Sequence, residues 1–552
     1  MVISVHPVPC VPFGSHPPRP PDLFFDKTAR SQHEAGMETH HISPGSDQPL
    51  IRLTAAILAG LLVLRVFALL ADPNSLYADE TQYWLWSRSL DWGYFSKPPM
   101  IAWIIASTTA IFGNADWAVR LAAPFLHSIT AVMLGLTAAR LFDVRVGAFT
   151  ALGWAVMPAV WLSSTIISTD AVLMAGFSTA LYALVRLREA PDWRFALLLG
   201  AATGYAFLSK YAAIYLLIGL GISLVIDAPS RRALLSVQGA AALALFALII
   251  SGNVIWNAEH EFATVSHTAA NANWGGSLFH PEELLDFLSG QLGVFGPVFF
   301  IVLIAAVITA FRDVSLDWNA ARPRLMLVGF CVPVLLIVCA QAFISRAHAN
   351  WAASAYVSGV ILVTAFLLTG PKWRRWALYG SLGLHTIAGL ALMAFAASTP
   401  LSDAAGLANA FKRVRGWPET VQAVEVIARE QDVATLVFDN RNDFHQFQRY
   451  GQDFDGKVFM WVRAEHAQNF AEQTWPLPDG YAEPVLVISE RPEEEPLLAW
   501  DFAEFERLDE IAIPLGGDRY RRYQVFRAQE HERIARDADY EARVAALRAD
   551  AP

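Results

Sequence analysis

Long apolar runs divide most of the chain into segments of the length that crosses a membrane. The first run, residues 51–71, has about 20 residues, and an α-helix of that length spans the hydrocarbon core of a bilayer. Further apolar runs lie near residues 117–140, 146–168, 171–187, 195–210, 212–227, 234–256, 291–311, 325–344, 352–370 and 376–397. Lys210 interrupts one of them, so two short helices are expected to turn around it. The pattern predicts a polytopic α-helical membrane protein with about eleven transmembrane helices.

Basic residues are concentrated in every second connection between these runs. The connections hold Arg140 and Arg145; Arg186, Arg188 and Arg194; Arg231 and Arg232; Arg312, Arg322 and Arg324; and Lys372, Arg374 and Arg375. Because short cytoplasmic loops carry an excess of Lys and Arg, we expect these connections to face the cytoplasm. The loops at 79–97, 169–170, 257–290 and 345–351, and the tail after residue 399, then face the extracytoplasmic side. We expect a multi-pass protein of the cell (inner) membrane with a cytoplasmic N-terminus.

The two ends of the chain differ from its apolar middle. Residues 1–50 are rich in Pro, His and Ser and predict a disordered cytoplasmic segment, in which Met37 is an alternative start to Met1. Residues 51–398 form the predicted transmembrane domain. Residues 399–552 predict a small extracytoplasmic α/β domain with strands at 434–439, 458–462 and 484–489 and helices at 417–430 and 465–475. From about residue 530 the charged tail predicts an exposed helix or a frayed end.

Composition agrees with a membrane protein and excludes several classes of function. Of the 552 residues, 55% are hydrophobic and 17% are charged, and the mean hydropathy is +0.36, which excludes a conventional soluble enzyme. A net charge of −10 without a basic cluster argues against nucleic acid as a partner. The three cysteines form neither a disulfide framework nor a zinc motif.

Carboxylates stand at the outer ends of the predicted spans. Asp79 and Glu80 open the first outer loop, YADETQYWLWSRSLDWGYFSKPPM, and Asp170 lies in IISTDAVLM with almost no polar neighbours. The plain alternatives are a solvated helix end for the first pair and the N-cap of a helix starting at Ala171 for Asp170.

Cations lie on the same side of the membrane. They are Lys97, Lys210, Arg346 and His348. Lys210 has the alternative of snorkelling to the interface. Ionisable groups at a membrane edge usually face a cavity where they find partners. Such a set suits a lipid-linked phosphate donor and a hydroxyl acceptor, because cations neutralise a phosphate leaving group and a carboxylate accepts the proton of the acceptor.

Two further groups of polar residues have plainer explanations. The 257–290 loop holds several His and Glu residues, but their spacing matches no zinc motif, so we favour a loop that covers the substrate. Asn440, Arg441 and Asn442 follow a predicted strand and form either an ordinary polar turn or a contact for a head group. We therefore assign no metal site; no cofactor is required, although a divalent cation could assist phosphate departure.

The order of these motifs resembles a known family. The DE pair, KPP, the outer TD, GYAFLSK, IWNAEHEFATVSH, FLSGQLGVFGP and RAHANWAASAY resemble the family 39 membrane glycosyltransferases of the GT-C superfamily over roughly residues 51–490. Relatives include the protein O-mannosyltransferases, the lipid A aminoarabinose transferase and the galacturonosyl transferases of lipopolysaccharide core. The resemblance implies a GT-C fold with short juxtamembrane helices in the first outer loop, one of them at residues 98–112.

The resemblance also implies roles for individual residues. Asp79 matches the catalytic base, Glu80 a supporting acid and Asp170 the second essential acid. Lys97 matches a lysine that contacts the donor phosphate, although Ser96 stands where many relatives have Glu. The remaining cations, Lys210, Arg346 and His348, correspond to groups that bind the donor phosphate or line the cavity.

The function expected from the residues and the resemblance is that of an inverting glycosyltransferase. It would move a sugar from a polyprenyl-phosphate donor to an extracytoplasmic acceptor, which is lipid A or lipopolysaccharide, a surface glycan or a protein hydroxyl. The main alternative is a transporter or flippase of lipid-linked sugars, but transporters usually contain paired repeats, and the motifs show none. A membrane-anchored sensor or scaffold would not need so many charges at the outer ends of its spans.

Overall fold

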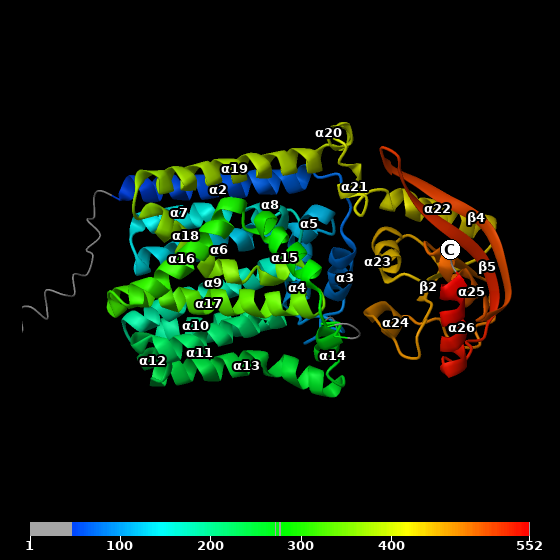
Figure 1. The fold of residues 1–552 in the computed structure, drawn as a ribbon. Coiled ribbons are helices and arrows are strands. Elements are labelled where there is room, and N and C mark those ends of the chain that lie inside the picture. Colours follow the sequence, from blue (N-terminus) through cyan, green and yellow to red (C-terminus); the bar gives the residue numbers. More distant parts are fainter. Residues whose placement is uncertain (1–46, 271, 275–277, 551–552) are drawn as a thin grey trace, which may run out of the picture. The chain divides into compact units, whose positions relative to one another are not determined.

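The computed structural model describes residues 47–270, 272–274 and 278–550. Helices pack lengthwise into a bundle, and a smaller part with a β-sheet follows it in the sequence (Figure 1). Most of the predicted N-terminal segment, residues 1–46, lies outside the described residues. The division of the chain at residue 398 stays a prediction.

The helices of the bundle and its loops are α2 (Gln48–Ala71), α3 (Ala78–Ser87), α4 (Met100–Phe112), α5 (Asp116–Arg120), α6 (Ala122–Leu141), α7 (Val144–Ala155), α8 (Pro158–Ser163), α9 (Thr169–Glu189), α10 (Trp193–Ser209), η1 (Tyr211–Ala213), α11 (Ile214–Ile226), α12 (Ala228–Leu234), α13 (Val237–Glu259), α14 (Ala263–Ala270), α15 (Pro281–Val294), α16 (Pro297–Val314), α17 (Trp318–Ile344), η2 (Ala349–Ala352), α18 (Ala355–Leu368) and α19 (Lys372–Ala397). A helix is confirmed at the predicted residues 98–112, as α4; its juxtamembrane position stays a prediction.

Fewer helices qualify as membrane spans, judged by their length and composition, than the sequence predicted. Among the described residues, seven helices are long and apolar enough to cross a membrane, or eight if the bent pair Tyr211–Ile226 and Ala228–Leu234 is one span. The count of eleven is therefore not confirmed. The single span predicted at 146–168 is wrong: α7 ends at Ala155 and α8 begins at Pro158, because proline lacks the N–H that a continuous helix needs.

The helix break predicted at Lys210 is confirmed. Helix α10 ends at Ser209, and Lys210 adopts an extended backbone before η1 and α11. The extended residue turns the chain at the end of α10, so the lysine side chain lies at a helix terminus rather than within a span.

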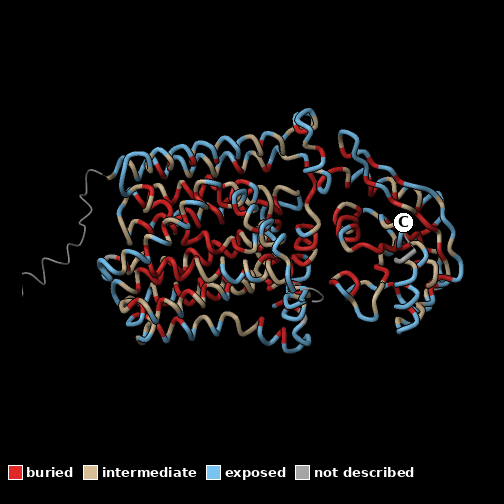
Figure 2. The backbone as a smooth tube through the Cα atoms, in the orientation of Figure 1, coloured by how far each residue is buried: buried red, intermediate tan, exposed pale blue. Residues whose placement is uncertain are grey.

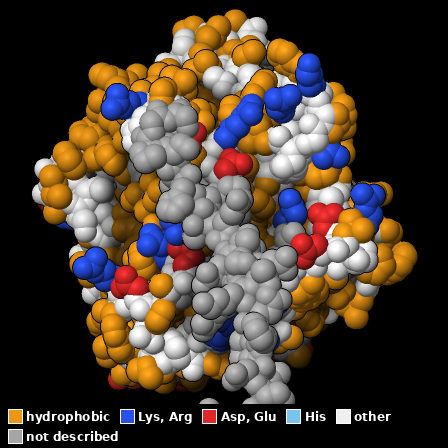
Figure 3. All heavy atoms as spheres, turned by 90° about the vertical axis from the view of Figure 1, so that its left-hand side faces the viewer, with side chains coloured by type: hydrophobic (Ala, Val, Ile, Leu, Met, Phe, Trp, Pro, Cys, Tyr) orange, Lys and Arg blue, Asp and Glu red, His pale blue; other side chains and the backbone are white. Residues whose placement is uncertain are grey.

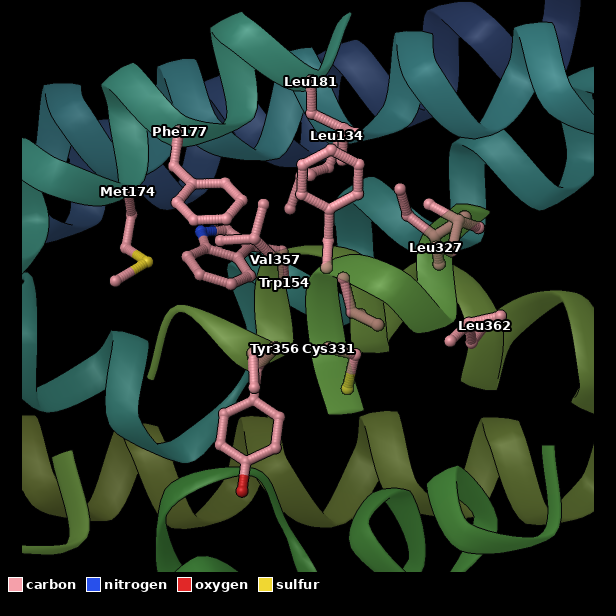
Figure 4. Close-up of a cluster of buried hydrophobic side chains, with 14 of the residues drawn as sticks. Leu134, Trp154, Met174, Phe177, Leu181, Leu327, Cys331, Tyr356, Val357 and Leu362 are labelled. Carbon is pink, nitrogen blue, oxygen red and sulfur yellow. The ribbon is translucent and has the colours of Figure 1, made fainter. Parts of the chain in front are cut away.

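Buried residues lie mainly in the interior of the bundle (Figure 2), and apolar side chains from several helices pack together there. Trp154, Phe177, Cys331 and Tyr356 are among the buried residues (Figure 4). The Tyr356 hydroxyl donates a 2.6 Å hydrogen bond to Oε1 of Gln291, so its one polar atom is satisfied inside the core. The outer faces of α2, α13 and α19 expose large apolar residues, as expected of helices that face lipid.

The C-terminal part is built on a five-stranded sheet of order β2-β1-β3-β5-β4. Its elements are α20 (Thr399–Ala404), α21 (Ala408–Phe411), α22 (Trp417–Glu430), β1 (Thr435–Phe438), α23 (Arg441–Tyr450), β2 (Lys457–Met460), α24 (Phe470–Thr474), β3 (Val485–Ser489), η3 (Pro492–Glu494), α25 (Glu495–Ala499), β4 (Phe502–Gly516), β5 (Arg519–His531) and α26 (Ala538–Asp550). Strands β2, β1 and β3 are parallel, and the β4–β5 hairpin adds two antiparallel strands.

The three predicted strands and the helix at 417–430 are confirmed. The helix predicted at 465–475 is wrong over its first half, because Asn469 accepts a hydrogen bond from the N–H of Glu472 and starts the helix only at Phe470. Helix α23 and the β4–β5 hairpin were not predicted. Both matter for the site, since α23 follows β1 directly and contacts the first outer loop.

Helix α23 joins the sheet to the loop that carries the DE pair. The side chain of Gln446 donates to the carbonyl of Leu76, and the N–H of Leu76 donates to the Tyr450 hydroxyl at 2.7 Å. Tyr450 in turn donates to Asp116 at 2.7 Å, and Arg449 forms an ion pair with the same carboxylate at 2.6 Å. These contacts hold the sheet domain directly over α3.

Arg449→Met is expected to loosen this attachment by about 1.5–3 kcal/mol, the value of a hydrogen bond to a charged group. Limited proteolysis of the detergent-solubilised protein should then cut residues 398–416 faster than in the wild type. Arg429→Met is the matched control, because the exposed Arg429 side chain donates, among the described residues, only to the carbonyl of Glu425 within α22. Equal cutting rates for the two variants would contradict the contact's role.

Candidate active site

Glu80 is held inside the protein by a network that uses both of its oxygens. Its Oε2 accepts from the N–H of Tyr77 at the start of α3, and its Oε1 accepts from the N–H of Ile167. Arg120 donates to it through Nε at 3.0 Å and through Nη2 at 2.8 Å. Glu80 and Arg120 are each only 2% exposed. The buried carboxylate therefore fixes the start of α3 and has little capacity left for substrate.

Arg120 extends this network to the end of the first span. It donates to Asp72 at 3.1 Å and to the carbonyls of Asn74 and Ser75. The guanidinium thus ties residues 72–80 together from one side. A charge buried this deeply is stable only with such complete pairing.

Asp79 lies beside Glu80 in the first turn of α3 but has the opposite environment. Its side chain is exposed, and it lines a cavity of about 730 Å³. Among the described residues, no hydrogen bond or ion pair engages its carboxylate. The α-helical turn places consecutive side chains on different faces, so one carboxylate enters the protein and the other faces the cavity.

Asp170 is held between a cation and an amide. Lys210 donates to its Oδ1 at 2.6 Å, and Asn350 donates to its Oδ2 at 2.9 Å. The alternative that Asp170 is an N-cap is wrong, because α9 begins at Thr169 and Ser168 occupies the N-cap position. Lys210 is likewise not a lone snorkelling lysine, since it pairs with a carboxylate from another helix.

Asp79 and Asp170 both interact electrostatically with the ammonium of Lys97. Burial is the largest cause of the lowered pKa of its ammonium, and the nearby Lys210 lowers it further. Asp79 and Asp170 raise the same pKa, and Arg441 lowers it. Two carboxylates and two further cations, from different parts of the chain, therefore act on the ammonium of Lys97.

Arg441 is the member of this group that comes from the sheet domain. It is the first residue of α23, and Asn440 caps the helix by accepting from the N–H of Asn442 at 2.9 Å. Arg441 and Asn442 line the same cavity as Asp79. Residues 440–442 were expected to form a polar turn or a contact for a head group. In the structure Asn440 caps α23, and Arg441 lies in the same cavity as Asp79.

His267 belongs to the loop that we expect to cover the substrate. Its ring lies 5.4 Å from that of Phe95, and burial lowers the pKa of its imidazole, with Lys97 and Arg441 as further causes. An imidazole in this electropositive setting is held neutral more strongly than in water. This loop therefore contributes a neutral polar group next to the cations.

Arg346 and His348 lie on the loop that also carries Asn350, but both side chains are exposed. The His348 ring contacts Trp351 with centroids 5.4 Å apart. Within the described residues, no hydrogen bond or ion pair joins Arg346 or His348 to Asp79 or Asp170. Asn350, which was not predicted as a site residue, contacts Asp170 from this loop. Its position in the RAHANW motif is the sequence feature that could have identified it.

The described part of the chain contains no group of three or more His, Cys, Asp and Glu side chains that could hold a metal ion. Lys97, Lys210 and Arg441 contribute positive charge to the site. A free carboxylate beside such cations can accept a proton from a hydroxyl while the cations stabilise a departing phosphate.

Known proteins resemble the chain in sequence and in fold. Residues 96–256 match the dolichyl-phosphate-mannose-protein mannosyltransferase family. The chain is 34% identical to the lipid A galacturonosyltransferase of Rhizobium johnstonii over 439 residues, which cover 79% of this chain and 90% of that protein. It is 25% identical to the lipopolysaccharide core galacturonosyltransferase of the same organism, over 52% of this chain and 59% of that protein.

Two solved structures of ArnT from Cupriavidus metallidurans share the fold. The apo form has a TM-score of 0.60 and 17% identity, covering 87% of this chain and 98% of ArnT. The form bound to undecaprenyl phosphate has a TM-score of 0.60 and 16% identity, covering 86% and 97%. The predicted fold, a polytopic helical bundle with a small C-terminal sheet domain, is confirmed.

Proposed function

Since the chain belongs to the family 39 membrane glycosyltransferases of the GT-C superfamily, we propose that it transfers a galacturonosyl group from a polyprenyl-phosphate donor to lipid A or lipopolysaccharide. The identity shared with the lipid A galacturonosyltransferase supports the sugar and the acceptor class. Undecaprenyl phosphate bound to ArnT supports the class of donor. The observation that carries the proposal is the free carboxylate of Asp79, which lines one cavity with Arg441 and interacts electrostatically with Lys97.

The proposed reaction is one displacement that inverts the anomeric carbon. Asp79 accepts the proton of the acceptor hydroxyl as its oxygen attacks the anomeric carbon of the sugar. The bond between that carbon and the phosphate oxygen breaks, and the polyprenyl phosphate leaves with the bonding electron pair. Lys97 and Lys210 stabilise the charge that develops on the phosphate. No covalent enzyme intermediate and no resident cofactor are required.

The other predicted residues support these groups. Asp170 orients Lys210 through their 2.6 Å ion pair, and Glu80 fixes α3 and thereby the position of Asp79. We assign Arg346 and His348 to the place where the donor enters the active site, because their loop also carries Asn350, which contacts Asp170.

We place this site on the extracytoplasmic side of the inner membrane, with the N-terminus in the cytoplasm. Lys and Arg side chains gather around the end of the bundle opposite the sheet domain (Figure 3). Such an end is the one that faces the cytoplasm under the positive-inside rule. The sheet domain and Asp79 then face the periplasm.

The class of donor can be tested with purified protein in lipid nanodiscs and lipid A as acceptor. Polyprenyl-phosphate galacturonic acid should give a glycosylated product, and the corresponding nucleotide sugar should give none. Turnover with the nucleotide sugar alone would contradict the proposed donor.

Lys210→Met is expected to lower kcat by roughly 10- to 100-fold. Its ammonium makes a charged hydrogen bond worth about 1.5–3 kcal/mol, and each 1.36 kcal/mol in the barrier changes the rate tenfold. Initial rates at saturating donor measure the effect. The control is Lys372→Met, which removes an exposed lysine at the start of α19; an equal loss in both variants would exclude a specific role for Lys210.

A further inference from the structure

The cavity that Asp79 lines is unusually basic for a chain with a net charge of −10. Its other wall belongs to the connection after α21 and to the sheet domain. The cations of that wall are Lys412, Arg413, Arg441, Arg521 and Arg522. Their concentration on one cavity, in an acidic protein, indicates an anionic ligand.

Four of these five cations form no ion pair with a described carboxylate. They are Lys412, Arg413, Arg441 and Arg521, whereas Arg522 pairs with Glu510 at 2.6 Å. Lys412 and Arg413 are also exposed to the cavity. Their charges are therefore available to a ligand.

Besides Asp79, the acids that line the cavity already have hydrogen-bond partners within the protein. Burial raises the pKa of Asp443 well above its ordinary value, and its Oδ1 accepts from the hydroxyl of Tyr523 at 2.9 Å. Asp443 is therefore harder to ionise than an exposed aspartate. Glu490 is already bound by the amide of Asn440 at 2.6 Å.

Arg521 holds the backbone of this cavity wall in place. Its side chain is buried and lies 3.6 Å over the ring of Trp417. It donates to the carbonyl of Arg415 at 2.9 Å and to the carbonyl of Lys412 at 3.1 Å. The guanidinium therefore fixes the backbone that presents Lys412 and Arg413, so their positions are set by the hairpin strand β5.

We propose that this cavity binds an anionic group, phosphate or sugar carboxylate, carried by the acceptor saccharide, and that it selects acidic glycolipids as acceptors. This inference rests on the proposed function. Asp79 and the cations line one cavity, so an acceptor whose anion is bound by Lys412 and Arg413 presents a hydroxyl to Asp79. The donor phosphate has separate partners in Lys97 and Lys210.

The test compares three acceptors in the nanodisc assay with wild type and with Lys412→Gln/Arg413→Gln. The acceptors are phosphorylated lipid A, the same lipid A after phosphatase treatment, and dephosphorylated lipid A that carries an acidic core sugar. The double variant should raise the KM for an acidic acceptor at least about tenfold, because charged hydrogen bonds are lost. Its kcat and its KM for the donor should stay unchanged.

The acceptors distinguish the two sources of negative charge. A lower wild-type KM for the phosphorylated lipid identifies phosphate as the bound group, and a lower KM for the acidic-sugar derivative identifies a carboxylate. Arg429→Gln/Lys457→Gln is the matched control, since both residues are exposed on the same domain and neither lines this cavity.

Three results would overturn the inference: equal wild-type KM values for all three acceptors, an effect of the double variant on the donor KM alone, or the same effect in the control. Absence of transfer by the wild type with every acceptor would instead count against the proposed function itself.

Discussion

Asp79→Asn is expected to abolish sugar transfer in a protein that folds and binds its donor normally. The carboxylate faces the cavity and no other described side chain engages it, so the amide replaces it without breaking a contact. An amide cannot accept the proton of the acceptor hydroxyl. General-base catalysis contributes about 10²–10⁴-fold, which is the expected loss in kcat. Initial rates and thermal unfolding of the same preparation measure both effects.

Asp286→Asn is the control for this substitution, because Asp286 is an exposed carboxylate on α15 that does not line the cavity. Its rate should equal that of the wild type. Retained turnover in Asp79→Asn would contradict the role of Asp79 and would move it to Asp170 or Glu80.

Glu80→Gln is expected to destabilise the protein, although the residue stands next to Asp79 in the sequence. The substitution leaves the Arg120 guanidinium buried without its main counter-charge. Breaking a buried ion pair from one side costs about 3–5 kcal/mol. Thermal unfolding in detergent should therefore begin at a clearly lower temperature than for Asp79→Asn.

A double variant tests whether the pair acts as a unit. Glu80→Gln/Arg120→Met removes both charges, so its loss of stability should be smaller than the sum of the two single losses. A Glu80→Gln protein that is as stable as the wild type but inactive would contradict the structural role and make Glu80 a catalytic acid.

The contrast between Asp79 and Glu80 marks a limit of prediction from the sequence. The sequence identified Asp79 and Glu80 as candidates, because charged groups at the end of a membrane span are costly and usually have a function. Their roles could not be separated, since Glu80 depends on Arg120 and Ile167, which lie 40 and 87 residues further along the chain. Only the tertiary structure brings these partners together.

The sheet domain shows a second limit. Its three parallel strands were predicted because they are short apolar runs, and strands that are buried on both faces have nearly continuous apolar sequences. The β4–β5 hairpin was missed although FAEFERLDEIAIPLG partly alternates apolar and polar residues. Helix α23 was missed because RNDFHQFQRY is polar, yet Asn440 offers an N-cap and Phe444 and Phe447 share one face. With α23 identified, Arg441 would have been a stronger site candidate.

The membrane spans show why apolar length alone is insufficient. Residues 146–168 are apolar enough for one span, but Pro158 starts a new helix after a break. The juxtamembrane helix α4 is also apolar, and it was excluded from the spans only through the family resemblance. Hydropathy locates apolar helices well but does not determine which of them cross the bilayer.

Mass spectrometry of the glycolipids of three strains can detect transfer of a sugar to a lipid A or lipopolysaccharide acceptor through Asp79. These strains lack the protein, carry the wild type, or carry Asp79→Asn. The wild-type strain should have a glycolipid heavier by one hexuronic acid residue, which is missing from both the deletion strain and the Asp79→Asn strain. An identical set of glycolipids in all three strains, with altered levels of polyprenyl-linked sugar, would rule out transfer through Asp79.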